Sequence, residues 1–284
     1  TDFWGMVFNP SSVERLSHTL GGAFLAGAFL VISVSAYYLI KKRHEEIAKA
    51  GLKIALLVAL FASLFQLFTG HSSASGVAVN QPAKLAAMEA HYDSLSPGDL
   101  YMFGWVNETD KKVYGIAIPG MLSFLIHGDP TVPIRGLDSF PKDEIPPVNV
   151  TFQTYHLMVA IGFSLIGLTL ISIFLWWRGK LFTSVLWLKI LVVSVLLPQI
   201  ANQIGWYTAE IGRQPWIVYG LLKTSDGLSK TVTSEHIIFS LILFTLIYAG
   251  LFVVFLYLLD KKIKHGPEAK TKELDFSENL RMTE

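Results

Sequence analysis

Long apolar runs separated by short polar segments dominate the chain and predict membrane-spanning helices. Residues 16–40, 152–177 and 237–259 contain no Lys, Arg, Asp or Glu. Two further runs fit with an interruption each: residues 54–69, extended backwards past Lys53, and residues 181–209, which hold Lys189 and Pro198. About 20 apolar residues in a helix span the hydrocarbon core of a bilayer. The pattern therefore predicts an all-α, polytopic transmembrane bundle of about five spanning helices.

Basic segments follow the first, third and fifth of these runs, at residues 41–49, 177–180 and 260–264. Lys and Arg are enriched in loops on the cytoplasmic side of a membrane. We therefore expect the N-terminal lead-in and the loops 70–151 and 210–236 to face outside, and the C-terminus to be cytoplasmic. The lipid membrane is an expected partner, and nucleic acid is not.

The pattern divides the chain into five segments. They are an interfacial lead-in at 1–15, a two-helix hairpin at 16–69, an outer loop at 70–151, a three-helix region at 152–259 and a tail at 260–284. The outer loop is too long to lack structure in a compact protein unless it is functional or disordered. Residues 84–92 have a short helical pattern, and residues 113–120 alternate like a strand, so we expect an ordered cap.

Ionisable and soft side chains inside spanning helices indicate functional sites, because burying them in lipid is costly. His18 lies at the outer start of the first helix, Met158 in the outer third of the third, and Glu210 at the outer end of the fourth. His and Met form a known axial pair for haem iron, and a carboxylate suits a high-spin haem with an open position. Gly21 and Gly22, which follow His18, would let a flat macrocycle approach the backbone.

Each of these residues also has a simpler interpretation. His18 could be a capping or interface residue, Met158 could be ordinary packing, and Glu210 with Arg213 could be a structural ion pair. The chain contains no Cys, which excludes disulfides, iron–sulfur clusters and C-x-x-C-H haem attachment. Only His18 and His156 lie well inside the runs, too few for a haem–copper centre or a two-haem bis-His cytochrome.

Four stretches carry a resemblance to a known family. They are GWYTAEIGRQPW (205–216), ERLSHTLGGAFLAG (14–27), TYHLMVAIGF (154–163) and NQPAKLAAMEAHYD (80–93). The chain resembles subunit I of cytochrome bd-type quinol oxidases, in its short quinol-loop form, over essentially residues 1–265. The resemblance implies a terminal respiratory oxidase of a prokaryotic plasma membrane, which oxidises quinol and reduces dioxygen to water.

Carried over by position, the resemblance implies that His18 and Met158 are the axial ligands of a low-spin haem b. Glu210 would be an axial ligand at a high-spin site that holds a second haem b and haem d. Arg213 would neutralise Glu210 or a haem propionate, and Trp206 would lie on the path between haems. Electrons would pass from quinol to the low-spin haem and then to the high-spin pair.

The same resemblance assigns Lys84 and Glu89 to quinol oxidation in the outer loop. His156 is a departure, because better-known members carry Arg two residues before the Met. A larger departure is that the family's N-terminal helices, which supply the other high-spin His ligand, do not precede this region. We therefore expect a C-terminal portion that needs those helices and subunit II as partners and is incomplete alone.

Two other interpretations stay open from the residues. One is a membrane transporter that uses Glu210 and Arg213 as an intramembrane substrate or proton site. The other is a non-catalytic assembly subunit that keeps the fold. An absorption spectrum separates them, because only the oxidase requires haem bands.

Overall fold

The computed structural model describes residues 2–9, 11–229 and 231–267. Five helical segments in this part are long and apolar enough to cross a membrane, which confirms the all-α prediction. Their elements are α2 (Ser12–Ile40), α3 (Glu45–Asn80), α6 (Val148–Trp177), α7 (Val185–Val193) with α8 (Leu196–Ile211), and α9 (Ser234–His265). Of the predicted tail at 260–284, residues 268–284 lie outside the described part.

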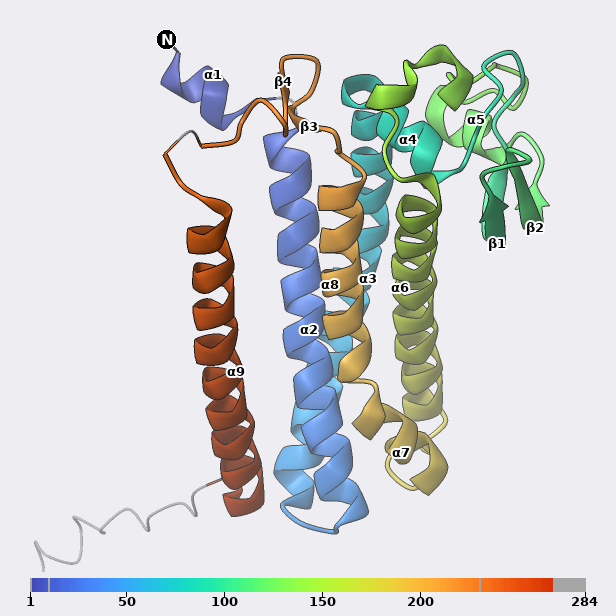
Figure 1. Ribbon diagram of the computed structural model, residues 1–284. Coiled ribbons are helices and arrows are strands. Elements are labelled where there is room, and N and C mark those ends of the chain that lie inside the picture. The colour runs from blue at the N-terminus through green and yellow to red at the C-terminus, as the bar shows by residue number, and fades with distance from the viewer. Residues whose placement is uncertain (1, 10, 230, 268–284) are drawn as a thin grey trace, which may run out of the picture.

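Helices α2, α3, α6 and α7–α8 form one bundle (Figure 1). Phe29 and Ile32 of α2 are fully buried with Leu52 and Leu56 of α3 and Leu165 of α6. Small residues at the α2–α3 contact let the two backbones approach closely, as is usual between membrane helices. They include Ala28, Ala36, Ala48, Ala55 and Ala59.

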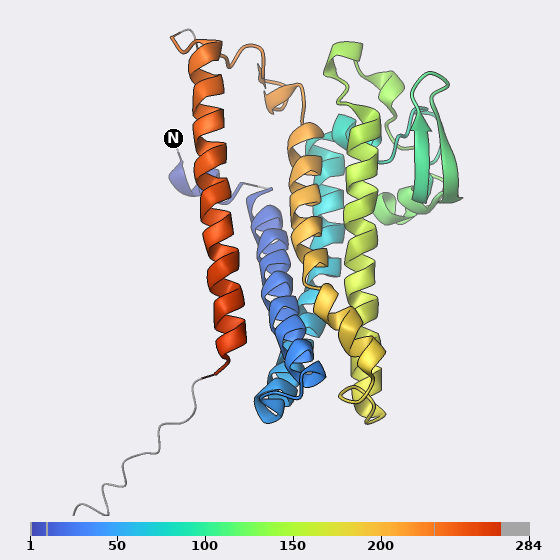
Figure 2. The ribbon, with the colours of Figure 1, turned by 60° about the horizontal axis from the view of Figure 1, so that its bottom comes forward.

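Helix α9 stands apart from this bundle along most of its length (Figures 1 and 2). It is tied to the rest of the chain near its C-terminal end. There the Tyr38 hydroxyl donates to the carbonyl oxygen of Ile263 at 2.8 Å, and Arg43 Nη2 donates to that of Lys264 at 3.0 Å.

The fourth predicted run, residues 181–209, forms one spanning segment, Val185–Ile211, but this segment is not a continuous helix. The structure breaks it at Ser194 and Val195, between α7 and α8. Pro198 lies in the first turn of α8, where a missing backbone N–H leaves no helical hydrogen bond unmade. In a continuous helix the same proline would remove the bond to the carbonyl of Ser194, so the proline accounts for the break.

The outer loop begins later than expected, because α3 continues through residues 70–80 to Asn80. It contains α4 (Pro82–Met88), the antiparallel strands β1 (Leu100–Asn107) and β2 (Lys112–Ile118), α5 (Met121–His127), and 3₁₀ turns at Leu137–Ser139 and Lys142–Glu144. The predicted helix at 84–92 is thus present but ends at Met88, and the predicted strand at 113–120 is β2. Ala83, Ala86 and Ala87 of α4 pack with Val106 of β1 and Phe152 of α6.

Two smaller elements complete the chain: α1 (Phe3–Val7) in the lead-in, and a hairpin of β3 (Trp216–Val218) and β4 (Leu222–Lys223) after α8. Elements α4, α5 and β1–β4 lie at one end of the bundle, here called the loop end (Figure 1). The basic segments 41–43, 178–180 and 261–264 all lie at the opposite end, here called the basic end. This separation is the one that the charge pattern predicts.

Candidate functional site

The imidazole of His18 is held by one turn of α3. Its Nδ1 lies 3.2 Å from the Thr69 hydroxyl, and its Nε2 lies 3.1 Å from the side-chain Nε2 of Gln66. The ring also lies against Gly70, where a Cβ would be 3.5 Å from its Cε1. A Cβ at position 70 would be in ordinary van der Waals contact with the ring, so α3 holds His18 through Thr69 and Gln66 and lies close to it at Gly70.

Met158 projects from α6 toward α8. A Cβ added at Gly205 would lie only 2.7 Å from the Met158 sulfur, so the thioether lies directly on the α8 backbone. The absence of a side chain at Gly205 is what makes room for the sulfur there.

His18 and Met158 lie at the same depth. Gly22 of α2 contacts Asn202 of α8, since a Cβ at Gly22 would be 2.6 Å from the Asn202 Oδ1. His18 is about one helical turn from Gly22 toward the loop end, and Gly205 is about one turn from Asn202 in the same direction. Because Met158 rests on Gly205, the imidazole and the thioether reach a common level from two helices of one bundle.

The donors at this level, one imidazole and one thioether, are of the kind that hold a haem iron. A Cβ at Gly21 would collide with the Gln66 side-chain oxygen, and that oxygen is buried with no hydrogen-bond partner among the described residues. No group of three or more His, Cys, Asp or Glu suited to a bare metal ion occurs in the part of the chain that the structure describes. A haem iron needs only two protein ligands, since its porphyrin supplies the others.

Glu210 and Arg213 form an ion pair at the loop end of α8. Arg213 Nη2 and Nε both donate to Glu210 Oε2, at 2.7 and 3.0 Å, and Nη1 donates to the carbonyl oxygen of Trp216 at 3.1 Å. Both side chains are partly exposed. Oε1 of Glu210 takes no part in the pair. Trp206, one turn before Glu210, is 58% exposed on the surface of the bundle.

Lys84 joins the outer loop to this ion pair. Its ammonium donates to the carbonyl oxygen of Ala209 at 3.2 Å, and its Cε lies against Gly212. The side chain is buried, and this burial, with the nearby charge of Arg15, lowers the pKa of Lys84 to about 8. The negative charge of Glu210 acts in the opposite direction. The structure thus gathers Lys84, Glu210 and Arg213 at one place.

Glu89 follows the end of α4 and points instead toward α6. Its residue is 1% exposed, and neither carboxylate oxygen has a hydrogen-bond partner within the described residues. Oε2 lies 3.7 Å from Nε2 of His156, whose Nδ1 is bonded to the carbonyl oxygen of Phe152 at 2.9 Å. Burial raises the pKa of Glu89 to about 8, and the Tyr155 hydroxyl partly opposes that rise.

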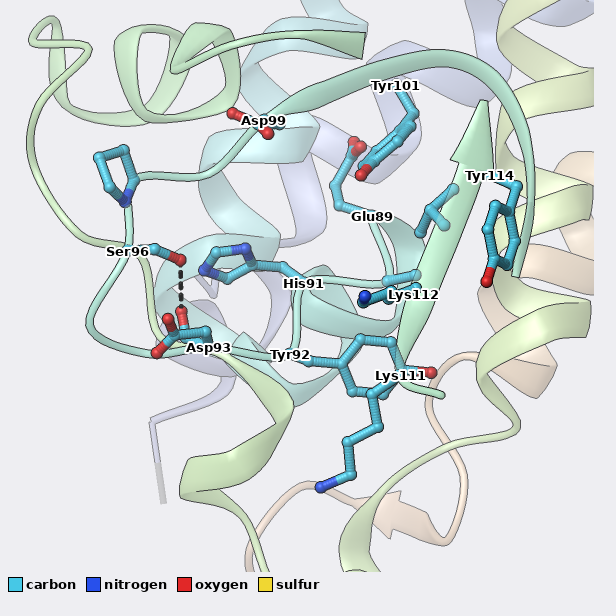
Figure 3. A pocket seen from close by; sticks show the side chains of 13 residues that line it. Glu89, His91, Tyr92, Asp93, Ser96, Asp99, Tyr101, Lys111, Lys112 and Tyr114 are labelled. Carbon is cyan, nitrogen blue, oxygen red and sulfur yellow. Dashed lines mark hydrogen bonds between the residues drawn. The ribbon is translucent and has the colours of Figure 1, made fainter. Parts of the chain in front are cut away.

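Glu89 also lines a cavity of about 380 Å³ between the end of α4 and the β1–β2 hairpin (Figure 3). Its wall is mostly polar and includes His91, Tyr92, Asp93, Ser96, Asp99, Tyr101, Lys111, Lys112 and Tyr114. A carboxyl that is almost without solvent exposure therefore lies at the edge of a hydrophilic space in the loop.

The structure shows contacts that the sequence did not reveal. Thr69 and Gln66 at His18 were missed, although Gln66 is a polar residue inside an apolar run and could have been noticed. His156 was noticed only as a departure, and its pairing with Glu89 joins segments far apart in the chain. The helix that carries Lys84 is buried along almost its whole length, from Ala83 to Met88.

The architecture defines a polytopic helical membrane protein, in which an imidazole of α2 and a thioether of α6 lie at a similar depth. A family model for cytochrome bd terminal oxidase subunit I matches residues 1–267, and the chain belongs to this family. It is 33% identical over 278 residues to cytochrome bd ubiquinol oxidase subunit 1 of Bacillus subtilis, covering 94% of this chain and 59% of that protein. A putative cytochrome bd menaquinol oxidase subunit I of the same organism is 36% identical over 268 residues, covering 91% of this chain and 59% of that protein.

A solved structure of the bd oxidase from Geobacillus thermodenitrificans shares the fold. Its TM-score is 0.83 at 32% sequence identity, with 94% of this chain and 61% of that chain covered. The present chain therefore spans about three fifths of the length of the relatives it matches.

Proposed function

We propose that this chain forms the low-spin haem site and part of the high-spin site of a membrane quinol:dioxygen oxidoreductase. Membership of the cytochrome bd subunit I family supports the reaction class. The observation that carries the proposal is the common depth of His18 and Met158. Haem bound there would supply a one-electron carrier, and high-spin haem b and haem d near Glu210 would supply the dioxygen chemistry.

His18 and Met158 would hold the low-spin iron from opposite helices. A thioether is a soft ligand that favours reduced iron, so Met158 would raise the potential of the site. Gly21 and Gly22 are in contact with the side chains of Gln66 and Asn202. Phe29 and Ile32, further along α2 toward the basic end, are fully buried in the core of the bundle.

Glu210 would serve as a carboxylate ligand at the high-spin site. Arg213 donates twice to Oε2, so Oε1 would be the oxygen that holds the iron. The guanidinium would offset the charge of the ligand or of a propionate, and Lys84 would add a second cation at the same place. Trp206 would lie beside this site, one turn away on α8.

Quinol oxidation would use the outer loop. Releasing two electrons from a quinol also releases two protons, so a proton acceptor must lie near the hydroxyl. Glu89 meets that need because its pKa of about 8 is close to working pH. The polar cavity beside it would connect the carboxyl to outside water (Figure 3).

The orientation follows from the charges: the basic end faces the cytoplasm and the loop end faces outside. The C-terminus would then be cytoplasmic in a prokaryotic plasma membrane. The expected protein partners are the family's N-terminal subunit I helices and subunit II.

The test is a reduced-minus-oxidised absorption spectrum with oxygen uptake driven by quinol, in membranes that contain the assembled complex and no other oxidase. The proposal expects haem bands that weaken at the low-spin position when His18 is changed to Ala. A complex with no haem bands would favour the transporter or assembly-subunit interpretation. An unchanged low-spin band in His18→Ala would show that the iron is held elsewhere.

A further inference from the structure

The imidazole of His18 has a polar neighbour on α3 at each of its two ring nitrogens. Both ring nitrogens are engaged by a single turn of α3, at Thr69 and Gln66. Thr69 is only 4% exposed, so its hydroxyl has no competing water. A neutral imidazole has one N–H and one lone pair, so the identity of its partners decides which nitrogen carries the proton.

Three contacts are compatible with one tautomer. The Thr69 hydroxyl has the carbonyl oxygen of Gln66, which can only accept, as a second neighbour at 3.4 Å. A hydroxyl that donates to this carbonyl presents a lone pair to Nδ1 of His18, which then donates. Nε2 is left as the acceptor, and it faces the amide nitrogen of Gln66, which is a donor.

We propose that Thr69 is the positioning residue for His18 as an iron ligand. Resting on the proposed function, this assigns to the Thr69 oxygen the task of accepting Nδ1–H, so that the Nε2 lone pair is available for iron. Ligating histidines characteristically donate their second N–H to an outer partner, which fixes tautomer and ring orientation and raises ligand basicity. Gln66 occupies the Nε2 position and would give way to the iron.

The hydrogen bond has a consequence for the redox potential. An Nδ1–H that is bonded to oxygen makes the imidazole a stronger electron donor, which stabilises oxidised iron. Removing the acceptor weakens that donation, so the midpoint potential of the low-spin haem should rise.

The test compares Thr69→Val, which keeps the shape without the acceptor, with Thr69→Ser, which keeps the acceptor. Thr169→Val is the matched control, because Thr169 is 1% exposed and its hydroxyl bonds only to the Leu165 carbonyl of its own helix. The assembled complex is titrated potentiometrically in membranes at the low-spin haem band, and the oxidised low-spin signal is recorded by electron paramagnetic resonance.

We expect Thr69→Val to raise the potential and shift the resonance, and Thr69→Ser and Thr169→Val to match the native complex. If the complex with Thr69→Val does not assemble, Thr69→Ala removes the same hydroxyl with a smaller side chain, and its potential and resonance then test the role of Thr69. A native potential and resonance in Thr69→Val, or in Thr69→Ala where that variant decides, would overturn the role of Thr69. His18→Ala distinguishes failure of the proposed function from failure of the role of Thr69. If His18→Ala loses the low-spin haem while Thr69→Val is unchanged, only the role of Thr69 fails. If it keeps the haem, the proposed function fails.

Discussion

Glu89 and His156 face each other at 3.7 Å between carboxylate Oε2 and imidazole Nε2, in a region where both residues are buried. His156 is stacked on Phe152, with ring centroids 3.9 Å apart, so the helix fixes the ring beneath the outer loop. Two residues further along the same helix is Met158. Helix α6 therefore carries both Met158 and the imidazole that the Glu89 carboxylate of the outer loop faces.

Glu89→Gln should slow quinol oxidation by about 100-fold or more, because general base catalysis typically contributes that much. Haem content should stay intact, since Gln has the same shape. With a pKa of about 8, the native carboxyl is mostly protonated at neutral pH, so the rate should rise as pH approaches 8. The variant should lose that rise.

Asp93→Asn is the control, a cavity carboxyl that already accepts from the Leu95 N–H at 2.9 Å. An unaffected rate in Glu89→Gln would contradict the assignment.

His156→Arg should move the pH profile of quinol oxidation to lower pH. A fixed positive charge beside Glu89 stabilises the carboxylate and lowers its pKa, so the base form is present at lower pH. The measurement is kcat/KM for quinol against pH in complexes with native haem content. A profile that stays in place would mean that the guanidinium does not reach Glu89.

The apolar runs predicted the number of spans because the thickness of a bilayer dictates helix length. The ends were less predictable. Residues 70–80 continue α3 because Val77 and Ala78 pack against Leu85 and Leu122 of the loop, a tertiary contact with no local signal. The break in the fourth span has a local signal in Pro198, which lies in the first turn of α8.

The candidate site divides in the same way. Glu210 and Arg213 lie three residues apart in the sequence, and this spacing predicts that their side chains meet, since three residues form about one helical turn. The Glu89–His156 contact depends on how α4 packs on α6, and the Thr69–His18 bond on the register between α2 and α3. A run of apolar residues predicts a helix but does not predict how that helix is aligned with its neighbours.

Met158→Leu should weaken or shift the low-spin haem band and lower its potential. The substitution keeps the side-chain volume nearly constant and costs less than about 1.5 kcal/mol in stability, but it removes the soft donor that favours reduced iron. A redox titration of the band in assembled membranes measures the effect. A native band and potential would remove Met158 from the ligand set.

Gly205→Ala should disturb the same haem without touching a ligand. The new Cβ would lie 2.7 Å from the Met158 sulfur, so the thioether must move. We expect a shifted low-spin band, and Gly167→Ala is the control because a Cβ there meets nothing within 4 Å. Both changes raise helix propensity alike. Equal spectra for the two variants would show that the sulfur position is not critical.

Arg213→Lys should impair the high-spin site while sparing the low-spin haem. Arg213 spreads three hydrogen bonds over two groups, the Glu210 Oε2 and the Trp216 carbonyl oxygen. A lysine keeps the charge but has no planar fork to hold both groups at once, so Glu210 should lose its fixed orientation. We expect reduced high-spin absorbance and oxygen uptake with a native low-spin band. Lys49→Met, which breaks the exposed pair with Glu45 at the basic end, should leave both signals unchanged. Full activity in Arg213→Lys would mean that charge alone, and not the geometry of the guanidinium, is what Glu210 requires.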